Sequence, residues 1–427
     1  MSATTEQIHE AILRTREARD RVQLRSTDAI AAALARAAKN WLAADSPWRR
    51  RAVEQAPATT GFSSAMVNEA VDLTFAPITE HALRELLSSG SPLANEGEAG
   101  IASAISGERE KRRRASRSHQ HPQIIVHFLA GNVPAPGLAS ICCGLLSKSA
   151  NLIKVSSRDP VFPALFVESV RAVDAELAGC AAVLDWRREE VTLTRAALTE
   201  ADAVIAYGDD ETIASIRRMT RPDAHFLGYG HKLSFAVIGK AVLTKENLPR
   251  LAEAAAFDAS VYDQQGCLSP HAFYVEDGGL VSPRAFAAAL AEAMASYQAR
   301  VPRGELSVEE AAQVAKLRGA YEFRSASDKS VAVWAGGGTN DWLVIYEEDP
   351  MFTPSCLNRV VFVKPVTRLE SIPQFMRRFA SSLSTAGLAP MDGRTTAFAG
   401  ELIKLGVSRV CPIGQMQRPR LAWQLAG

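Results

Sequence analysis

The chain has 427 residues, of which 47% are apolar and 22% are charged, and its formal net charge at pH 7 is +1. This length suits two or three domains, and the composition is that of an ordinary globular protein. The balanced charge gives no reason to expect nucleic acid or an anionic membrane as a partner. The longest apolar run, near residues 137–146, is too short to span a bilayer.

The cysteines form no CxxC pair and show no spacing typical of a metal site. They are Cys142, Cys143, Cys180, Cys267, Cys356 and Cys411. Scattered cysteines in a long chain, with no signal-peptide pattern, indicate reduced thiols in a cytosol. We therefore expect a cytoplasmic protein that uses no metal.

Two helical regions open the chain. Apolar residues recur at helical spacing from Thr5 to about Ala44 and again from Ser63 to Leu87. The polar stretch 107–122 that follows contains the basic run 111–114, which fits either a phosphate-binding patch or a solvated linker. Basic runs are usually solvated, so the linker is the preferred interpretation.

From residue 123 onward, strand-like and helix-like segments alternate. The predicted strands are 124–129, 151–155, 181–185 and 203–207, and the predicted helices are 134–146, 159–177 and 211–219. This alternation predicts a doubly wound parallel sheet that binds ligands at the carboxyl ends of its strands. The segment contains no GxGxxG fingerprint.

A second α/β domain is predicted to begin at the strand 234–238. Its predicted helices are 248–259, 283–297 and 307–317, and its predicted strands are 272–275, 331–334, 342–346, 359–363 and 406–410. The loop 262–270 lies between a helix and a strand of this domain and contains Cys267 directly after a glycine. Backbone N–H groups in such a loop can favour a thiolate, which is the nucleophilic form of cysteine.

Three residues suit one chemistry. Asn132 follows a predicted strand, where its amide could donate to an oxyanion, and Lys154 ends the next strand, where it could contact ribose or phosphate. Cys267 would supply the nucleophile. Each residue also has a structural alternative: a turn or cap for asparagine, a strand end for lysine and a small core residue for cysteine.

The order and spacing of these residues resemble the aldehyde dehydrogenase superfamily, in which an asparagine turn, a lysine-bearing strand, a glycine turn and a cysteine after glycine follow one another. Longer motifs are more narrowly similar to LuxC-type acyl-CoA (fatty acyl) reductases. These motifs are Gly61–Val67, Gly208–Ile213, Tyr229–Phe235, Asp263–Pro270 and Gly406–Val410.

The resemblance implies an α/β fold with a Rossmann-like cofactor domain, an α/β catalytic domain and a small oligomerisation flap. We expect these parts at residues 1–119 (helices of the cofactor domain), 120–130 (oligomerisation strand), 131–232 (cofactor domain), 233–405 (catalytic domain) and 406–427 (terminal strand and tail). Because the superfamily assembles through its flap, a homo-oligomer with segment 123–129 near the interface is expected.

The resemblance also implies a reaction, the reduction of an acyl thioester to an aldehyde by a nicotinamide cofactor. Cys267 would be the nucleophile and Asn132 the oxyanion donor, while His231 is either a proton relay or, as we prefer, a structural histidine. The implied cofactor contacts are Lys154, Ser156, Ser157, Arg158, Gly208, Asp209 and Thr212. An acidic residue three positions after the strand lysine favours NAD in this superfamily, and here that position is a serine followed by an arginine. NADPH is therefore expected rather than NADH.

Two departures from the superfamily pattern bear on the reaction. The segment 228–232 contains no carboxylate where hydrolytic aldehyde dehydrogenases carry a glutamate base, and a later ribose-binding glutamate is absent near 355–358. An enzyme without a water-activating base suits acyl transfer and hydride delivery. The donor stays open among CoA, a carrier protein and an acyl-activating partner enzyme. Alternatives are a γ-glutamyl-phosphate-type reductase, a hydrolytic aldehyde dehydrogenase, a non-redox cysteine acyltransferase or thioesterase, and a non-catalytic scaffold.

Overall fold

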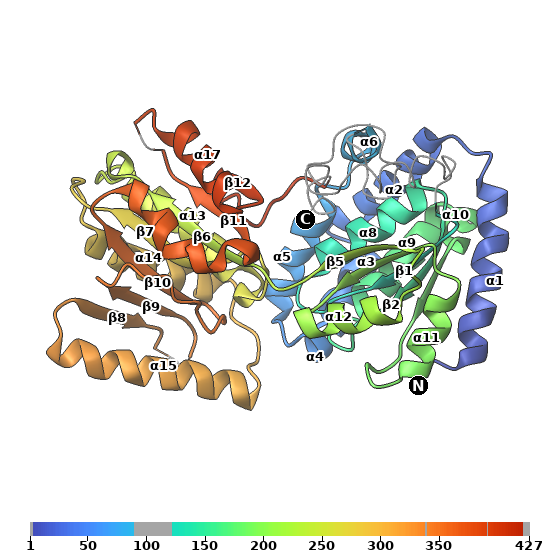
Figure 1. The fold of residues 1–427 in the computed structure, drawn as a ribbon, viewed down its shortest axis with the longest axis horizontal. Coiled ribbons are helices and arrows are strands. Elements are labelled where there is room, and N and C mark those ends of the chain that lie inside the picture. The colour runs from blue at the N-terminus through green and yellow to red at the C-terminus, as the bar shows by residue number, and fades with distance from the viewer. Residues whose placement is uncertain (1–2, 89–121, 338–339, 391, 422–427) are drawn as a thin grey trace. The chain divides into compact units, whose positions relative to one another are not determined.

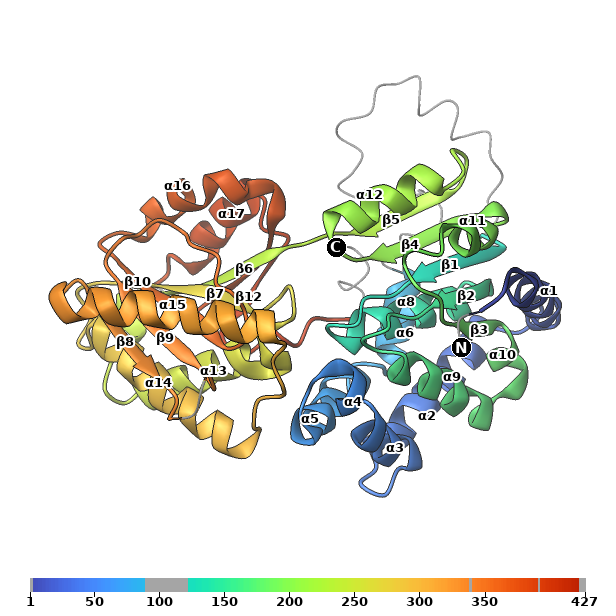
Figure 2. The ribbon, with the colours of Figure 1, turned by 90° about the horizontal axis from the view of Figure 1, so that it is seen from below.

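The computed structural model describes residues 3–88, 122–337, 340–390 and 392–421. The chain divides into two compact units, which Figures 1 and 2 show from two directions. The first unit comprises the described residues within 1–60, 68–230 and 420–427, and the second comprises those within 61–67 and 231–419. The expected boundary at 232/233 differs by two residues, and the short segment 61–67 was not expected to join the second unit.

The first unit is built on a five-stranded parallel sheet with the order β3-β2-β1-β4-β5. Its strands are β1 (Ile124–Phe128), β2 (Ala150–Lys154), β3 (Ala181–Leu184), β4 (Ala203–Tyr207) and β5 (His225–Tyr229). The chain runs outward from β1 through β2 and β3, and then returns to place β4 and β5 on the other side of β1. This arrangement is the doubly wound sheet that the sequence predicted.

Strand β1 lies in the middle of this sheet. Val126 pairs with Leu152 on one side and with Val204 on the other, and all five β1 residues are buried. A strand whose two edges are both paired has no free backbone groups to share with another chain. The expectation that 120–130 forms an oligomerisation strand is therefore wrong for the described part of that segment, and an oligomer cannot use β1 as a shared edge.

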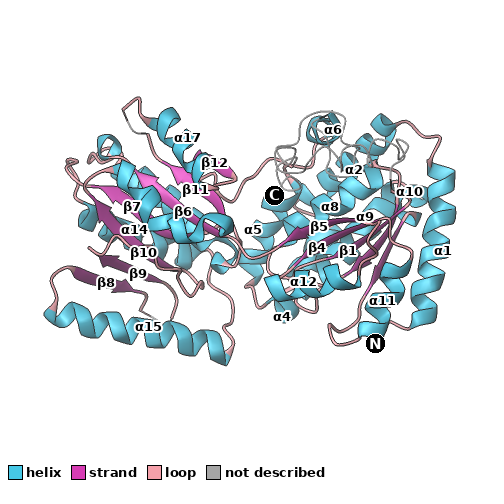
Figure 3. Cartoon of the chain, in the orientation of Figure 1, coloured by secondary structure: helices cyan, strands magenta, loops and turns pink. Residues whose placement is uncertain are grey.

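Helices cover both faces of the first sheet (Figure 3). The described helices before β6 are α1 (Thr5–Val22), α2 (Thr27–Leu42), α3 (Pro47–Gln55), α4 (Pro57–Thr60), α5 (Ser64–Phe75), α6 (Glu80–Ser88), α8 (Pro134–Leu146), α9 (Val161–Val173), α10 (Ala175–Gly179), α11 (Val191–Thr199) and α12 (Asp210–Met219). The first residues of α5 belong to the second unit, and α3 packs on α9 rather than on the sheet. Residues of α1, α11 and α12 share one hydrophobic core with the sheet, and α8 packs on the opposite face, where Ser140 meets His127 of β1. The expected helical region 5–44 is two helices, because Ser26 caps the start of α2.

The second unit contains a seven-stranded sheet with the order β12-β11-β6-β7-β10-β9-β8. Its strands are β6 (Leu233–Ile238), β7 (Pro270–Glu276), β8 (Val331–Ala335), β9 (Leu343–Glu347), β10 (Val360–Val366), β11 (Leu383–Leu388) and β12 (Arg409–Pro412). All pairs are parallel except β8 with β9. Because β12 pairs with β11 in this sheet, residues 409–412 belong to the second unit, as was predicted for the strand at 406–410.

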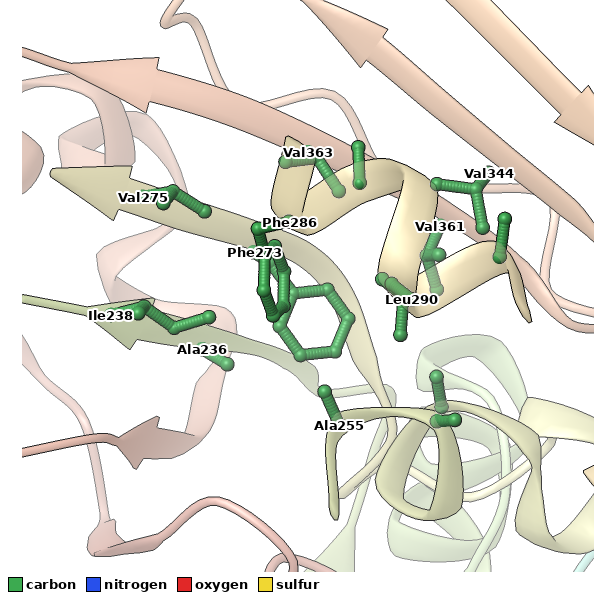
Figure 4. Close-up of a cluster of buried hydrophobic side chains, with 14 of the residues drawn as sticks. Ala236, Ile238, Ala255, Phe273, Val275, Phe286, Leu290, Val344, Val361 and Val363 are labelled. Atoms are coloured by element: carbon green, nitrogen blue, oxygen red, sulfur yellow. The ribbon is translucent and has the colours of Figure 1, made fainter. Parts of the chain in front are cut away.

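Helices also sandwich the second sheet. Helices α13 (Leu248–Ser260) and α14 (Pro283–Arg300) pack on one face, and α15 (Val308–Ser327), α16 (Ile372–Met376) and α17 (Thr395–Leu405) pack on the other. Figure 4 shows Phe286 and Leu290 of α14 against Phe273 of β7 and Val361 of β10. Alternate residues of β7 enter the two cores, as expected for a sheet covered on both faces. Among the described residues, no helix has the length and apolarity needed to cross a membrane.

Candidate active site

In the first unit, the predicted residues gather at the carboxyl edge of the sheet. Asn132 follows β1, Lys154 is the last residue of β2, and Gly208 follows β4. Since β2 and β4 flank β1 on opposite sides, this edge holds the point where the chain reverses its direction across the sheet. Ligands of doubly wound folds bind at this point.

The loop after β1 and the turn after β2 touch each other. A Cβ atom on Gly131 would lie 2.6 Å from both the Arg158 Cβ and the Ser156 Oγ, so only glycine allows this contact. The turn itself is ordered, because Ser156 Oγ accepts from the Arg158 backbone N–H at 3.2 Å and Asp159 accepts from that of Phe162 at 3.0 Å. The close packing sets the backbone beside Asn132.

Lys154 is half-buried at this edge. Burial lowers the pKa of Lys154, and two carboxylates that follow β3, Asp185 and Glu189, act in the opposite direction. Ser157 and Arg158 are exposed on the turn after β2. Sequence reasoning missed Asp185 and Glu189, although their place just after a predicted strand was a signal that could have identified them.

The turn after β4 has a structural role of its own. Asp209 caps α12 by accepting from the Thr212 backbone N–H at 2.6 Å, and this hydrogen bond is the main cause of a lowered pKa of Asp209. Gly208 lies against the same residue, since an added Cβ would be 3.2 Å from the Thr212 Cβ. The cofactor contacts expected for these three residues stay a prediction.

In the second unit, the candidate residues lie at the amino ends of the strands, whereas in the first unit they lie at the carboxyl ends. Cys267 precedes β7, His231 precedes β6, and the segment 355–359 precedes β10. The strands β6, β7 and β10 are parallel neighbours, so their amino ends share one edge of the sheet. This edge brings Cys267 and His231 to the same end of the second unit.

Cys267 is the exposed cysteine among six, and the other five are buried or half-buried free thiols. Its carbonyl oxygen accepts from the Ser234 hydroxyl at 2.7 Å, and the same hydroxyl oxygen accepts from the Thr385 N–H at 3.1 Å. Although the residue as a whole is exposed, desolvation by the atoms around its sulfur raises the pKa of the Cys267 thiol to about 11, while its own backbone N–H and Lys232 act to lower it. The backbone N–H of the loop thus acts in the direction that favours the thiolate, as expected, and the role of Cys267 as nucleophile stays a prediction.

A second histidine lies beside this loop and was missed by sequence reasoning. His271 of β7 is buried, and its Nδ1 accepts from the Ser355 backbone N–H at 3.1 Å. Burial and, to a lesser degree, the nearby His231 together lower the pKa of His271 to about 4, so His271 is neutral at physiological pH. His231 itself is exposed.

The Cys267 loop also contacts the segment after β12. The Gln417 amide donates to the Ser269 Oγ at 3.0 Å and to the Asp258 carbonyl at 3.0 Å. The Asp258 carboxylate is buried and accepts from the backbone N–H groups of Gly414 and Met416. These bonds tie the segment 414–417 to a residue two positions after the cysteine.

Two further expectations concern the basic run at 111–114 and metal binding. The basic run 111–114 lies outside the described residues. Among the described residues, no group of three or more His, Cys, Asp or Glu side chains is arranged to hold a metal ion.

Comparison with known proteins identifies the family. The family model for acyl-CoA reductase (LuxC) matches residues 22–427, which is nearly the whole chain. The chain belongs to the LuxC family. The resemblance seen in the sequence motifs is thereby confirmed.

Relatives in the LuxC family include long-chain acyl-protein thioester reductases. The one from Aliivibrio fischeri is 28% identical over 299 residues, which cover 68% of this chain and 58% of that protein. The one from Photorhabdus luminescens is 28% identical over 297 residues, covering 68% and 59%. The match thus spans less than two thirds of the length of these relatives.

Solved structures with the same fold are aldehyde dehydrogenases. A NAD-dependent benzaldehyde dehydrogenase from Corynebacterium glutamicum matches with a TM-score of 0.68 and 13% identity, over 98% of this chain and 89% of its own. A glyceraldehyde-3-phosphate dehydrogenase from Methanocaldococcus jannaschii, complexed with NADP, matches with a TM-score of 0.67 and 12% identity, over 97% and 87%. The expected α/β fold of the aldehyde dehydrogenase type is confirmed.

Proposed function

We propose that this LuxC-family chain reduces an acyl thioester to an aldehyde, using a nicotinamide cofactor and a thioester formed on Cys267. The observation that carries the proposal is the exposed cysteine in a family whose model describes acyl-CoA reductases. The relatives named as acyl-protein thioester reductases support the same substrate class. The donor is a CoA ester, a carrier thioester or a thioester held by a partner enzyme.

In the proposed first half-reaction, the Cys267 sulfur attacks the acyl carbon and negative charge develops on the carbonyl oxygen. The Cys267 backbone N–H and the Asn132 amide would donate to this oxyanion. When the oxyanion collapses, the bond to the donor thiol breaks, and that thiol takes up the proton that Cys267 releases. A thiol with a raised pKa needs a base to take its proton, and His231, for which a structural role was preferred from the sequence, is the candidate because it lies at the same end of the second unit as Cys267.

In the second half-reaction, a hydride adds to the acyl carbon and a proton adds to its oxygen, which gives a thiohemiacetal on Cys267. Cleavage of the C–S bond then releases the aldehyde and returns the proton to the sulfur. The nicotinamide cofactor supplies the hydride. Lys154, Ser156 and the turn that follows them would hold the cofactor, and Gly131 lets the loop after β1 pack closely against that turn.

The acyl-enzyme should be long-lived when the reduced cofactor is withheld. The segment 228–232 contains no carboxylate that could activate water, so hydrolysis of the thioester should be slow. Intact-mass spectrometry after incubation with a panel of acyl-CoAs should show one acyl group per chain, and adding NADPH should discharge it as aldehyde. Rapid release of free acid would instead favour a hydrolytic enzyme, and transfer to another thiol without oxidation of NADPH would favour an acyltransferase.

We propose NADPH as the preferred cofactor. Ser157 and Arg158 present a hydroxyl and a cation on the exposed turn, which suits a phosphate carrying about two negative charges. Asp185 and Glu189 oppose this preference, because they act on Lys154 as nearby carboxylates. The value of kcat/KM should be higher with NADPH than with NADH, and Ser157→Glu should reverse the order while Asp185→Asn should strengthen it. Equal or better kcat/KM with NADH in the unaltered protein would contradict the proposal.

A further inference from the structure

Two runs of left-handed backbone stand at the edge of the second sheet that carries Cys267. Tyr262, Asp263 and Gln264 have φ values of 53°, 50° and 64°, and they end three residues before Cys267. A second run, Leu357–Arg359, has φ values of 61°, 60° and 62° and leads into β10. Residues with a side chain rarely adopt this conformation, and consecutive ones persist only where the surrounding contacts hold them.

The side chain of Gln264 joins the starts of β7 and β10. Its amide nitrogen donates to the carbonyl oxygens of Val360 at 2.8 Å and Pro270 at 2.9 Å, and its amide oxygen accepts from the Val360 N–H at 2.8 Å. Gln264 is completely buried. Its side-chain amide therefore extends the hydrogen-bonding between the paired strands β7 and β10. Because the site is buried, water cannot take over these hydrogen bonds if the amide is lost.

Arg359, which belongs to the second left-handed run, bonds to Asp263 in the first run. Its Nε and Nη2 lie 2.9 Å and 2.7 Å from the Asp263 carboxylate, and its Nη1 donates to Gln298 of α14 at 2.6 Å. Asp263 also accepts from the Gly304 N–H at 3.0 Å, and both charged side chains are buried. A third link joins the runs, since the Gln265 amide donates to the Asn358 Oδ1 at 2.9 Å.

We propose that Gln264 and Arg359 are positioning residues for Cys267. They hold the two left-handed runs together, and the run at 262–264 fixes the direction in which the chain enters the cysteine loop. Ser234 fixes the loop from its other side by its bond to the Cys267 carbonyl. Neither Gln264 nor Arg359 touches the reacting atoms. The inference rests on the proposed function in so far as Cys267 is the nucleophile.

The sharpest variant is Gln264→Glu, which keeps the size of the side chain and its bond to the Val360 N–H. When ionised, the new carboxyl cannot donate to the two carbonyl oxygens, so the run should loosen and the atoms that desolvate the cysteine sulfur should pack against it less closely. The pKa of the Cys267 thiol, measured from the pH dependence of its alkylation by iodoacetamide, should then fall toward that of an ordinary cysteine. Its rate of acylation by an acyl-CoA should fall about 100-fold, the scale expected for a small misplacement of a reacting group.

Burial should raise the pKa of the introduced carboxyl, and its protonated form can donate one of the two lost bonds. The ratio of the variant's acylation rate to that of the unaltered protein should therefore rise as the pH is lowered. Gln265→Met is a milder second variant, which removes one link between the runs without burying a charge. It should shift the alkylation profile in the same direction, by less.

The matched control is Glu347→Gln, which breaks the buried ion pair between Lys364 and Glu347 in the same sheet. It should lower the melting temperature and leave the alkylation profile of Cys267 unchanged. An unchanged thiol pKa and acylation rate in folded Gln264→Glu and Gln265→Met proteins, or an equal shift in the control, would overturn the proposal. If no thioester acylates the unaltered protein, the proposed function fails, and the alkylation profile still tests the positioning.

Discussion

Cys267→Ala should abolish both acyl labelling and aldehyde formation, because it removes the sulfur to which the acyl group is transferred. The variant should fold and bind NADPH as before, since Cys267 is exposed and its main fixed contact is made by its backbone carbonyl. Intact-mass spectrometry after incubation with acyl-CoA and absorbance of NADPH during turnover measure the two effects.

The matched control is Cys356→Ala, which removes a half-buried thiol from the segment before β10. Burial raises the pKa of that thiol to about 11 as well, so the two cysteines differ in place and exposure rather than in acidity. The control should keep labelling and turnover. If acyl labelling survives in Cys267→Ala and is lost in Cys356→Ala, the nucleophile is Cys356 and not Cys267.

Asn132→Ala should lower the rate of acyl transfer about 100- to 1,000-fold, the usual cost of removing one oxyanion donor. The loss should appear in kcat, with cofactor affinity kept, because an oxyanion donor acts on the transition state. Stopped-flow acylation and a separate NADPH titration distinguish the two effects.

Two further variants sharpen this test. Asn132→Asp has the same size but carries a carboxylate in place of the donor, so it should be at least as slow as Asn132→Ala. Asn68→Ala removes an exposed asparagine of the first unit, whose side chain bonds Arg49, and should leave the rate unchanged. If the Asn132→Ala variant reacts as fast as the Asn68→Ala variant, Asn132 is a turn residue and not an oxyanion donor.

The strands with long apolar runs were predictable from the sequence. Residues 360–363 are an uninterrupted run of valine and phenylalanine, residues 124–128 are β-branched or aromatic apart from His127, and both are interior strands in the structure. Strand β5 was missed, because His225–Tyr229 is a partly exposed edge strand with a glycine in it. Helix α11 was missed as well, since its short amphipathic pattern lies between two stronger strand signals.

The candidate site was predictable only where a residue stands next to a strand end. Asn132, Lys154 and Cys267 could be found in this way, because strand order in an α/β fold decides which ends meet. The contacts that support the cysteine loop could not be predicted from the sequence. Tyr262, Gln264 and Arg359 carry no turn signature, and the pair between Asp263 and Arg359 joins residues far apart in the sequence. The apolar pattern placed 124–129 in the parallel sheet, and the oligomerisation role of 120–130 came only from the family resemblance.

The bonds between the segment 414–417 and the cysteine loop bear on how this protein can be engineered. Gln417 reaches Ser269, and Asp258 accepts from two backbone N–H groups of that segment. A deletion that begins just after β12 would leave a carboxylate buried without donors and would free one side of the reactive loop. Truncations that remove residues 414–417 should therefore alter the reactivity of Cys267 as well as the stability of the second unit.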